Sequence, residues 1–203
     1  MTKQAVTTTA DQEFSHQNRM LLALHGPPGC GKSTLARVLA RLCGYRPQIV
    51  NASDVRSPSA LIEAIRAAVS CDSHFTDGQK PTCLIIDEVD GALQGNLSHT
   101  GFSQVTTYLS KCMALRAGET KSKDFAGRLN TVVALKRPII FICNDLYSRP
   151  LKTLREMTLN VKIEQSDPQR LISRMRQICR LESLPQDDQM MQQIAAANNY
   201  DAR

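Results

Sequence analysis

The sequence lacks the features that mark membrane, secreted and fibrous proteins. No apolar run approaches the ~20 residues of a membrane span, and the N-terminus has no charged-then-apolar signal pattern. We therefore expect neither membrane insertion nor secretion, and no membrane partner. Gly 10 and Pro 9 among 203 residues are too few for a fibrous or low-complexity chain.

Closely spaced cysteines are also missing. The seven cysteines include no C-x-x-C pair, so a zinc site would have to be assembled from scattered ligands. Their odd number and wide spacing indicate reduced thiols in an intracellular compartment. The net charge of +6 is a modest basic excess, which permits a polyanionic partner without demonstrating one. The apolar fraction of 42% is compatible with a globular domain that has a real core.

A phosphate-binding loop is present near residue 30. An apolar run from Met20 to His25 predicts a strand, and the G-P-P-G-C-G-K-S that follows fits G-x-x-x-x-G-K-S/T. Apolar residues at helical spacing come directly after the motif and predict a helix: Leu35, Val38, Leu39 and Leu42. This strand-loop-helix setting favours a phosphate loop over an ordinary glycine turn.

The motif also predicts which atoms bind phosphate. Glycines let the backbone curl so that successive N–H groups point inward, and the helix adds its positive dipole end. Pro27 and Pro28 have no N–H, so Gly26 opens the loop and the predicted donors follow it: Gly29, Cys30, Gly31, Lys32, Ser33 and Thr34. We expect the Lys32 ammonium to reach the β and γ phosphates and the Ser33 hydroxyl to bind Mg²⁺.

Two carboxylates end a second apolar run, C-L-I-I-D-E at residues 83–88. A run that is apolar on both faces predicts a central strand of a parallel sheet covered by helices. Two ionised carboxylates at its end are costly unless they are paired or bind metal. We expect Asp87 to hold Mg²⁺ opposite Ser33, and Glu88 to polarise a water for attack on the γ phosphate. A solvated acidic turn is the alternative.

An asparagine ends a third apolar run. Residues 139–143 predict a buried strand, and Asn144 follows it. Next to the carboxylate strand, its amide can hydrogen-bond the γ phosphate or the attacking water; the alternative is a turn residue that stops the strand. Further strands are predicted at residues 48–51 and 159–163. The sequence therefore predicts an α/β fold with a parallel sheet flanked by helices.

The remaining segments predict a tail, an insertion and a lid. Residues 1–17 are polar, as in a disordered tail or linker, and precede an α/β domain at residues 18–165. The region of about 116–137 is basic, and is either a flexible surface insertion or a contact to nucleic-acid phosphate. Its charged residues are Arg116, Glu119, Lys121, Lys123, Asp124, Arg128, Lys136 and Arg137.

Residues 166–203 are expected to begin a small all-helical lid. One helix is predicted from Pro168 and another over residues 186–198. Arginines of the first helix fall largely off its apolar face, as on a solvated surface. The apolar face of the first helix carries Leu171, Ile172, Met175, Ile178 and Cys179. The core candidates of the second helix are Met190, Met191 and Ile194.

Taken together, these motifs resemble those of AAA+ ATPases, a class of P-loop NTPase. N-A-S-D-x-R at residues 51–56 resembles clamp-loader subunits such as those of replication factor C. P-T-C-L-I-I-D-E-V-D-G at 81–91 and P-I-I-F-I-C-N-D-L at 138–146 resemble the large subunit of the alternative clamp loader, the chromosome transmission fidelity protein 18 family. Residues 92–137 carry little of the resemblance.

The resemblance implies a function and its partners. The family uses ATP and Mg²⁺ to open a sliding clamp and load it onto primer–template DNA, within a nuclear hetero-pentamer that contains smaller subunits. Replication and sister-chromatid cohesion are the implied processes. Residues 200–203 resemble a segment with a second sensor arginine, so Arg203 is expected to contact the nucleotide. A structural subunit that holds nucleotide while its partners hydrolyse it is the alternative.

Overall fold

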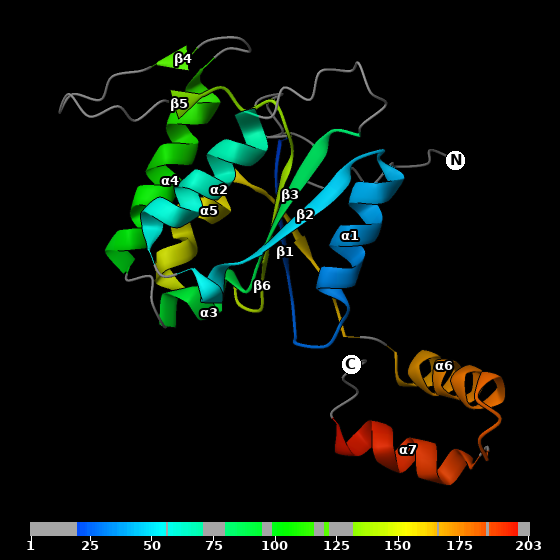
Figure 1. The fold of residues 1–203 in the computed structure, drawn as a ribbon. Helices are drawn as coiled ribbons and strands as arrows, with labels where there is room; N and C mark the ends of the chain where they lie inside the picture. The colour runs from blue at the N-terminus through cyan, green and yellow to red at the C-terminus, as the bar shows by residue number, and fades with distance from the viewer. Residues whose placement is uncertain are drawn as a thin grey trace, which may run out of the picture.

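A parallel β-sheet forms the centre of the molecule (Figure 1). A computed structural model describes the fold of residues 20–55, 57–70, 80–94, 99–115, 120–121, 132–165, 167–185 and 187–198. The sheet has five parallel strands in the order β2-β3-β6-β1-β7. They are β1 (Leu21–His25), β2 (Arg46–Asn51), β3 (Thr82–Asp87), β6 (Ile139–Cys143) and β7 (Leu159–Lys162). The predicted α/β class with a parallel sheet is confirmed.

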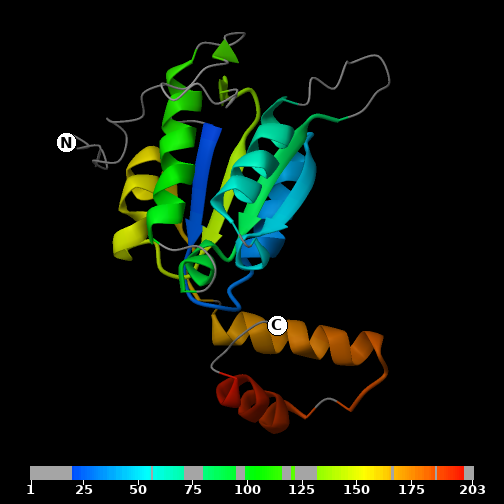
Figure 2. The ribbon, with the colours of Figure 1, turned by 60° about the vertical axis from the view of Figure 1, so that its left-hand side comes forward.

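Helices cover both faces of this sheet. Figures 1 and 2 show α1 (Lys32–Leu42) on one face, and α2 (Pro58–Ser70), α4 (His99–Ala114) and α5 (Lys152–Met157) on the other. Three short elements connect the layers: η2 (Ala52–Asp54), α3 (Val89–Gln94) and η4 (Arg149–Leu151). Within the described residues, none of the helices combines the length and the hydrophobicity that a membrane span requires.

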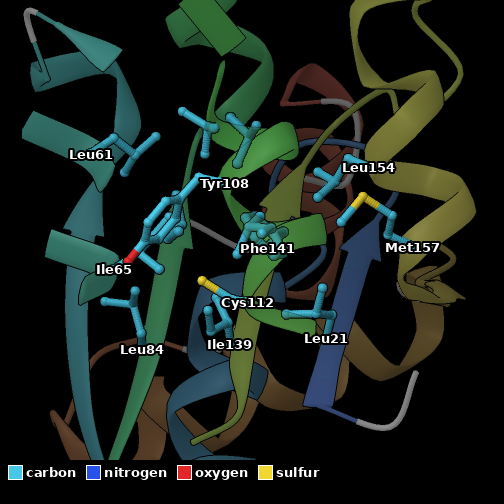
Figure 3. Packing of buried hydrophobic residues seen from close by; sticks show 14 of the residues in the cluster. Leu21, Leu61, Ile65, Leu84, Tyr108, Cys112, Ile139, Phe141, Leu154 and Met157 are labelled. Atoms are coloured by element: carbon cyan, nitrogen blue, oxygen red, sulfur yellow. The ribbon is translucent and has the colours of Figure 1, made fainter. Parts of the chain in front are cut away.

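Alternating side chains of the central strands fill two cores. On β6, Ile139 and Phe141 point to the layer of α2, α4 and α5, whereas Ile140 and Ile142 point to α1. Figure 3 shows Phe141 surrounded by residues of that larger core. Burial on both faces explains why this strand and β3 are apolar at nearly every position.

The helix predicted after the phosphate loop is confirmed, and its buried face is not the one that carries most of the apolar residues. Lys32, Ala36 and Ala40 are buried, while Val38 is 45% exposed and Leu42 is 79% exposed. Leu35 is exposed as well. Lys32 turns inward toward the loop, and the residues four and eight positions later follow it onto the sheet. Small alanines there let the helix lie close to the strands.

The two helices of the predicted lid are α6 (Pro168–Leu181) and α7 (Asp188–Ala197), and they pack chiefly on one another. They lie beyond the end of the sheet where β1 enters the phosphate loop (Figures 1 and 2). Of the predicted core residues of α7, Met191 is buried, but the prediction was wrong for Met190 and Ile194, which are exposed. On the apolar face of α6, Ile172 is buried and Ile178 is exposed. A pair of helices packed chiefly on one another encloses few side chains.

The basic insertion is only partly described. β4 (Thr120–Lys121) pairs antiparallel with β5 (Val132–Val133), at the end of the sheet opposite the phosphate loop (Figures 1 and 2). Val132 and Ala134 are buried in the core that α2 and α4 share, so this end of the segment is no surface loop. The predicted tail at residues 1–17, Arg116, Lys123 and Arg128 lie outside the described residues.

Candidate functional site

Three strand ends meet at one open cavity of about 470 Å³. Because β1, β3 and β6 are neighbours in a parallel sheet, the segments that leave their carboxyl ends lie at the same edge. The cavity brings together five of the predicted site residues: Lys32, Ser33, Asp87, Glu88 and Asn144. Residues that the sequence did not single out complete its lining: Pro28, Arg37, Asp90, Gly91, Ile142 and Cys143.

The phosphate loop has the backbone that an anion site requires. Gly29 and Gly31 have φ values of 72° and 87°, in the region that favours glycine. Gly31 stands at the N-cap of α1 and offers no side-chain cap. The N–H groups of the first helical turn, among them those of Lys32 and Ser33, therefore point out of the helix without an intrahelical acceptor. Such a turn can bind a phosphate.

Gly26, the first residue of the loop, lies against the backbone just after the end of β7. Its φ is 152°, and a Cβ added there would lie 2.1 Å from the carbonyl oxygen of Ile163. The N–H of Ile163 in turn donates to the carbonyl oxygen of His25 at 2.7 Å. Only glycine fits where the loop passes this close to the chain that leads to α6.

We expect Gly26→Ala to lower the free energy of unfolding by about 3 kcal/mol, because it adds both a clash and backbone strain. Gly44→Ala is the matched control: its φ is +81° with nothing within 4 Å of an added Cβ, so strain alone should cost about 1 kcal/mol. Urea unfolding of the two variants measures the difference. Equal losses would contradict the close approach at Ile163.

The Lys32 ammonium is buried within the loop and linked to β6. It donates to the carbonyl oxygens of Gly26 at 2.8 Å and Pro27 at 2.7 Å, and to Asn144 Oδ1 at 3.0 Å. Lys32 is only 6% exposed. A buried ammonium requires such partners, and these oxygens are ones that a phosphate group can replace.

Ser33 and Asp87 provide oxygen ligands that suit Mg²⁺. Asp87 Oδ1 accepts from the N–H of Glu88 at 2.9 Å, which orients the carboxylate. Among the described residues, no group of three or more His, Cys, Asp or Glu could hold a metal by itself. Mg²⁺ commonly uses one or two protein oxygens, substrate phosphates and water, so this pair fits that ion.

Glu88 has an unusual backbone and a partner on β2. Among the described residues, only Glu88 and Ser183 are non-glycine residues with positive φ, and the φ of Glu88 is 54°. Asn51 Nδ2 donates to Glu88 Oε2 at 3.3 Å, and Ser53 Oγ donates to the Glu88 carbonyl at 3.4 Å. Sequence reasoning did not assign Asn51 a role. Its place at the carboxyl end of the strand beside β3 is the signal that identifies it.

Burial keeps two further groups at this edge uncharged. Burial, and after it the charge of Lys162, lowers the pKa of His25, which packs edge-on against Tyr147 at 5.7 Å between ring centroids. Burial, with a smaller contribution from Asp90, raises the pKa of the Cys143 thiol to about 12. Neither group is therefore charged in this region at neutral pH.

The other predicted site residues have different placements. Gly29 is buried, Cys30 is partly exposed, and Thr34 is exposed in the first turn of α1. Arg203 lies outside the described residues. The structure therefore brings the phosphate loop, the carboxylate pair and Asn144 together.

Comparison with known proteins agrees with this geometry. Residues 22–165 match the model of the ATPase family associated with various cellular activities (AAA). The chain belongs to the AAA family. This AAA chain is 33% identical over 201 residues to the Chromosome transmission fidelity protein 18 homolog of Drosophila melanogaster, covering 99% of this chain and 19% of that protein. The Xenopus laevis homolog is 34% identical over 95% of this chain and 19% of that protein.

More distant relatives are replication factor C large subunits. That of Pyrobaculum arsenaticum is 29% identical over 95% of this AAA chain and 39% of that protein. The resemblance inferred from the sequence motifs is confirmed. The chain spans about a fifth of the length of the chromosome transmission fidelity relatives.

Proposed function

We propose that the chain binds ATP with Mg²⁺ in this cavity and hydrolyses it. The observation that carries the proposal is the convergence of the phosphate loop, the carboxylate pair and Asn144 on one cavity. AAA family membership supports nucleotide binding.

Each group has a distinct role. The N–H groups of residues 29–34 cradle the phosphates, and the Lys32 ammonium binds the β and γ phosphates. Ser33 and Asp87 hold Mg²⁺, which when bound neutralises charge on the phosphate oxygens. Glu88 accepts a proton from the attacking water, and Asn144 hydrogen-bonds that water or the γ phosphate.

Lys32 must exchange partners when it binds phosphate. Its ammonium donates to Gly26, Pro27 and Asn144. Phosphate oxygens replace these acceptors, which releases the side chain of Asn144. Asn144 can then respond to whether a γ phosphate is present.

Calorimetric titration with ATP and Mg²⁺ tests the proposal. We expect one ATP bound per chain, and weaker binding when EDTA removes Mg²⁺, because the Ser33 hydroxyl and the Asp87 carboxylate contribute to affinity only through the ion. A chain that remains folded but releases no binding heat, and whose unfolding temperature ATP does not raise, would contradict it.

We further propose that the chain belongs to a clamp-loading ATPase of the nucleus. Its relatives named chromosome transmission fidelity protein 18 and replication factor C large subunit support this proposal. In this role the chain joins smaller subunits in a hetero-pentamer, in which ATP turnover loads a sliding clamp onto primer–template DNA during replication and sister-chromatid cohesion. We assign residues 18–165 to the ATP-binding domain and 166–203 to a helical lid, in which we place Arg203 at the nucleotide.

The basic insertion is the proposed DNA contact. We expect replacing Lys121, Lys123 and Arg128 together by alanine to weaken primer–template binding and to flatten its dependence on log salt concentration by up to about 3 units. Fluorescence anisotropy at several salt concentrations measures both effects. ATP affinity should not change, since β4 and β5 lie at the end of the sheet opposite the cavity.

A variant of equal charge loss provides the control. Lys152, Arg170 and Arg174 are exposed elsewhere on the molecule, and replacing them by alanine should affect DNA binding less. Equal effects of the two triple replacements would leave only net charge as the cause and contradict a specific contact.

A further inference from the structure

The tip of β6 extends beyond the strand next to it. The pairing of β3 with β6 ends at Ile86 and Phe141. On the other side, β1 stays paired with β6 as far as His25 and Cys143. Asn144, the next residue, therefore has no β3 strand beside it to accept its backbone N–H.

A carboxylate takes the place of the missing strand. Asp90 Oδ2 accepts the N–H of Asn144 at 2.9 Å. Asp90 is in the first turn of α3, which follows Glu88 directly, and it lines the same cavity. A hydrogen bond to an ionised acceptor is stronger than one between neutral groups, so this contact can fix the strand tip.

The fixed backbone determines where the Asn144 side chain points. Its Oδ1 lies 3.0 Å from Lys32 Nζ, and Lys32 is tied to the loop carbonyls of Gly26 and Pro27. A continuous chain of hydrogen bonds thus runs from Asp90 through Asn144 to the phosphate loop. If the backbone N–H of Asn144 were not held, the side chain of Asn144 could move away from Lys32.

We propose that Asp90 is a positioning residue for Asn144. It holds the backbone N–H of Asn144 so that the amide side chain faces Lys32 and the position of the γ phosphate. The role deepens the proposed function and rests on it, since the orientation of Asn144 affects binding only when a nucleoside triphosphate places its γ phosphate in the cavity.

The first test needs no nucleotide. Asp90→Ala removes the acceptor, so the Asn144 amide should exchange with solvent about 10-fold faster, as measured by NMR on the full chain. Asp90→Asn keeps an acceptor oxygen and should retain most of the protection. The matched control is Asp145→Ala, because Asp145 Oδ1 accepts the N–H of Tyr147 at 2.8 Å at the same strand tip. An unchanged exchange rate in Asp90→Ala would overturn the proposal.

The second test compares ATP with ADP. We expect Asn144→Ala and Asp90→Ala each to reduce the preference for ATP over ADP by about 5-fold, because one hydrogen bond to the γ phosphate is lost or misdirected. The double variant should lose no more than either single one, and Asp90→Asn should stay near the wild-type preference. Calorimetric dissociation constants for both nucleotides give these ratios.

The outcomes separate the two proposals. Additive losses in the double variant would show that Asp90 acts independently of Asn144, as a metal ligand would, and overturn the positioning role. A similar loss in Asp145→Ala would show a general loosening of the strand tip and overturn it as well. A wild-type chain that binds neither nucleotide overturns the proposed function instead, while amide exchange still decides whether Asp90 holds Asn144.

Discussion

Lys32→Ala is expected to weaken ATP binding by about 100-fold, which is the typical cost of losing a charged hydrogen-bonding partner of phosphate. The ammonium is buried, and its acceptors in the loop and on Asn144 lie where phosphate oxygens can replace them. Among the described residues, Arg37 is the other cation that lines the cavity, and its side chain is exposed. Titration with ATP and Mg²⁺ measures the loss.

Two comparisons separate binding from folding in this experiment. Lys32→Met keeps the length of the side chain without its charge, so it should lose affinity as Lys32→Ala does while filling the same space. Lys152→Ala removes a charge from the exposed surface of α5 and should bind ATP as the wild type does. Affinity within about 3-fold of wild type in both Lys32 variants would contradict the assignment of the loop.

Glu88→Gln is expected to slow hydrolysis by about 1,000-fold while leaving ATP affinity within a few-fold of wild type. The amide is nearly the shape of the carboxylate and can still accept from Asn51, but it cannot take a proton from water. Single-turnover hydrolysis of radiolabelled ATP, in the presence of the smaller subunits proposed as partners, measures the rate.

The same measurement distinguishes the two kinds of subunit. If this chain only holds nucleotide while its partners hydrolyse theirs, the rate will not change in Glu88→Gln. Glu156→Gln removes an exposed carboxylate from α5 and provides the control. Equal rates in wild type and both variants would reject turnover by this chain.

Long apolar runs made the central strands predictable. β1, β3 and β6 are covered on both faces, so nearly all of their residues are apolar. The unbroken apolar run is what predicts each strand. β2 is at the edge of the sheet and begins at Arg46, two residues before the predicted start, because the exposed Arg46 and the half-buried Pro47 interrupt any apolar pattern there. The short helices α3 and α5 were not predicted, since contacts with neighbouring elements fix such short segments.

Site residues that belong to a local sequence motif could be predicted. Site residues whose partners depend on the order of strands in the sheet could not. The phosphate loop, Asp87 and Asn144 are recognisable from their local sequence. Asn51 and Asp90 acquire their partners only because β2, β3 and β6 are adjacent. That adjacency joins segments distant in the chain, which one sequence does not reveal.

The close approach of Gly26 to Ile163 couples the phosphate loop to the chain that leads into α6. The Ile163 N–H is bound to His25, and its carbonyl abuts Gly26, so neither can shift without the other. A displacement of the loop at Gly26 would therefore reach the chain that leads to α6 directly through Ile163.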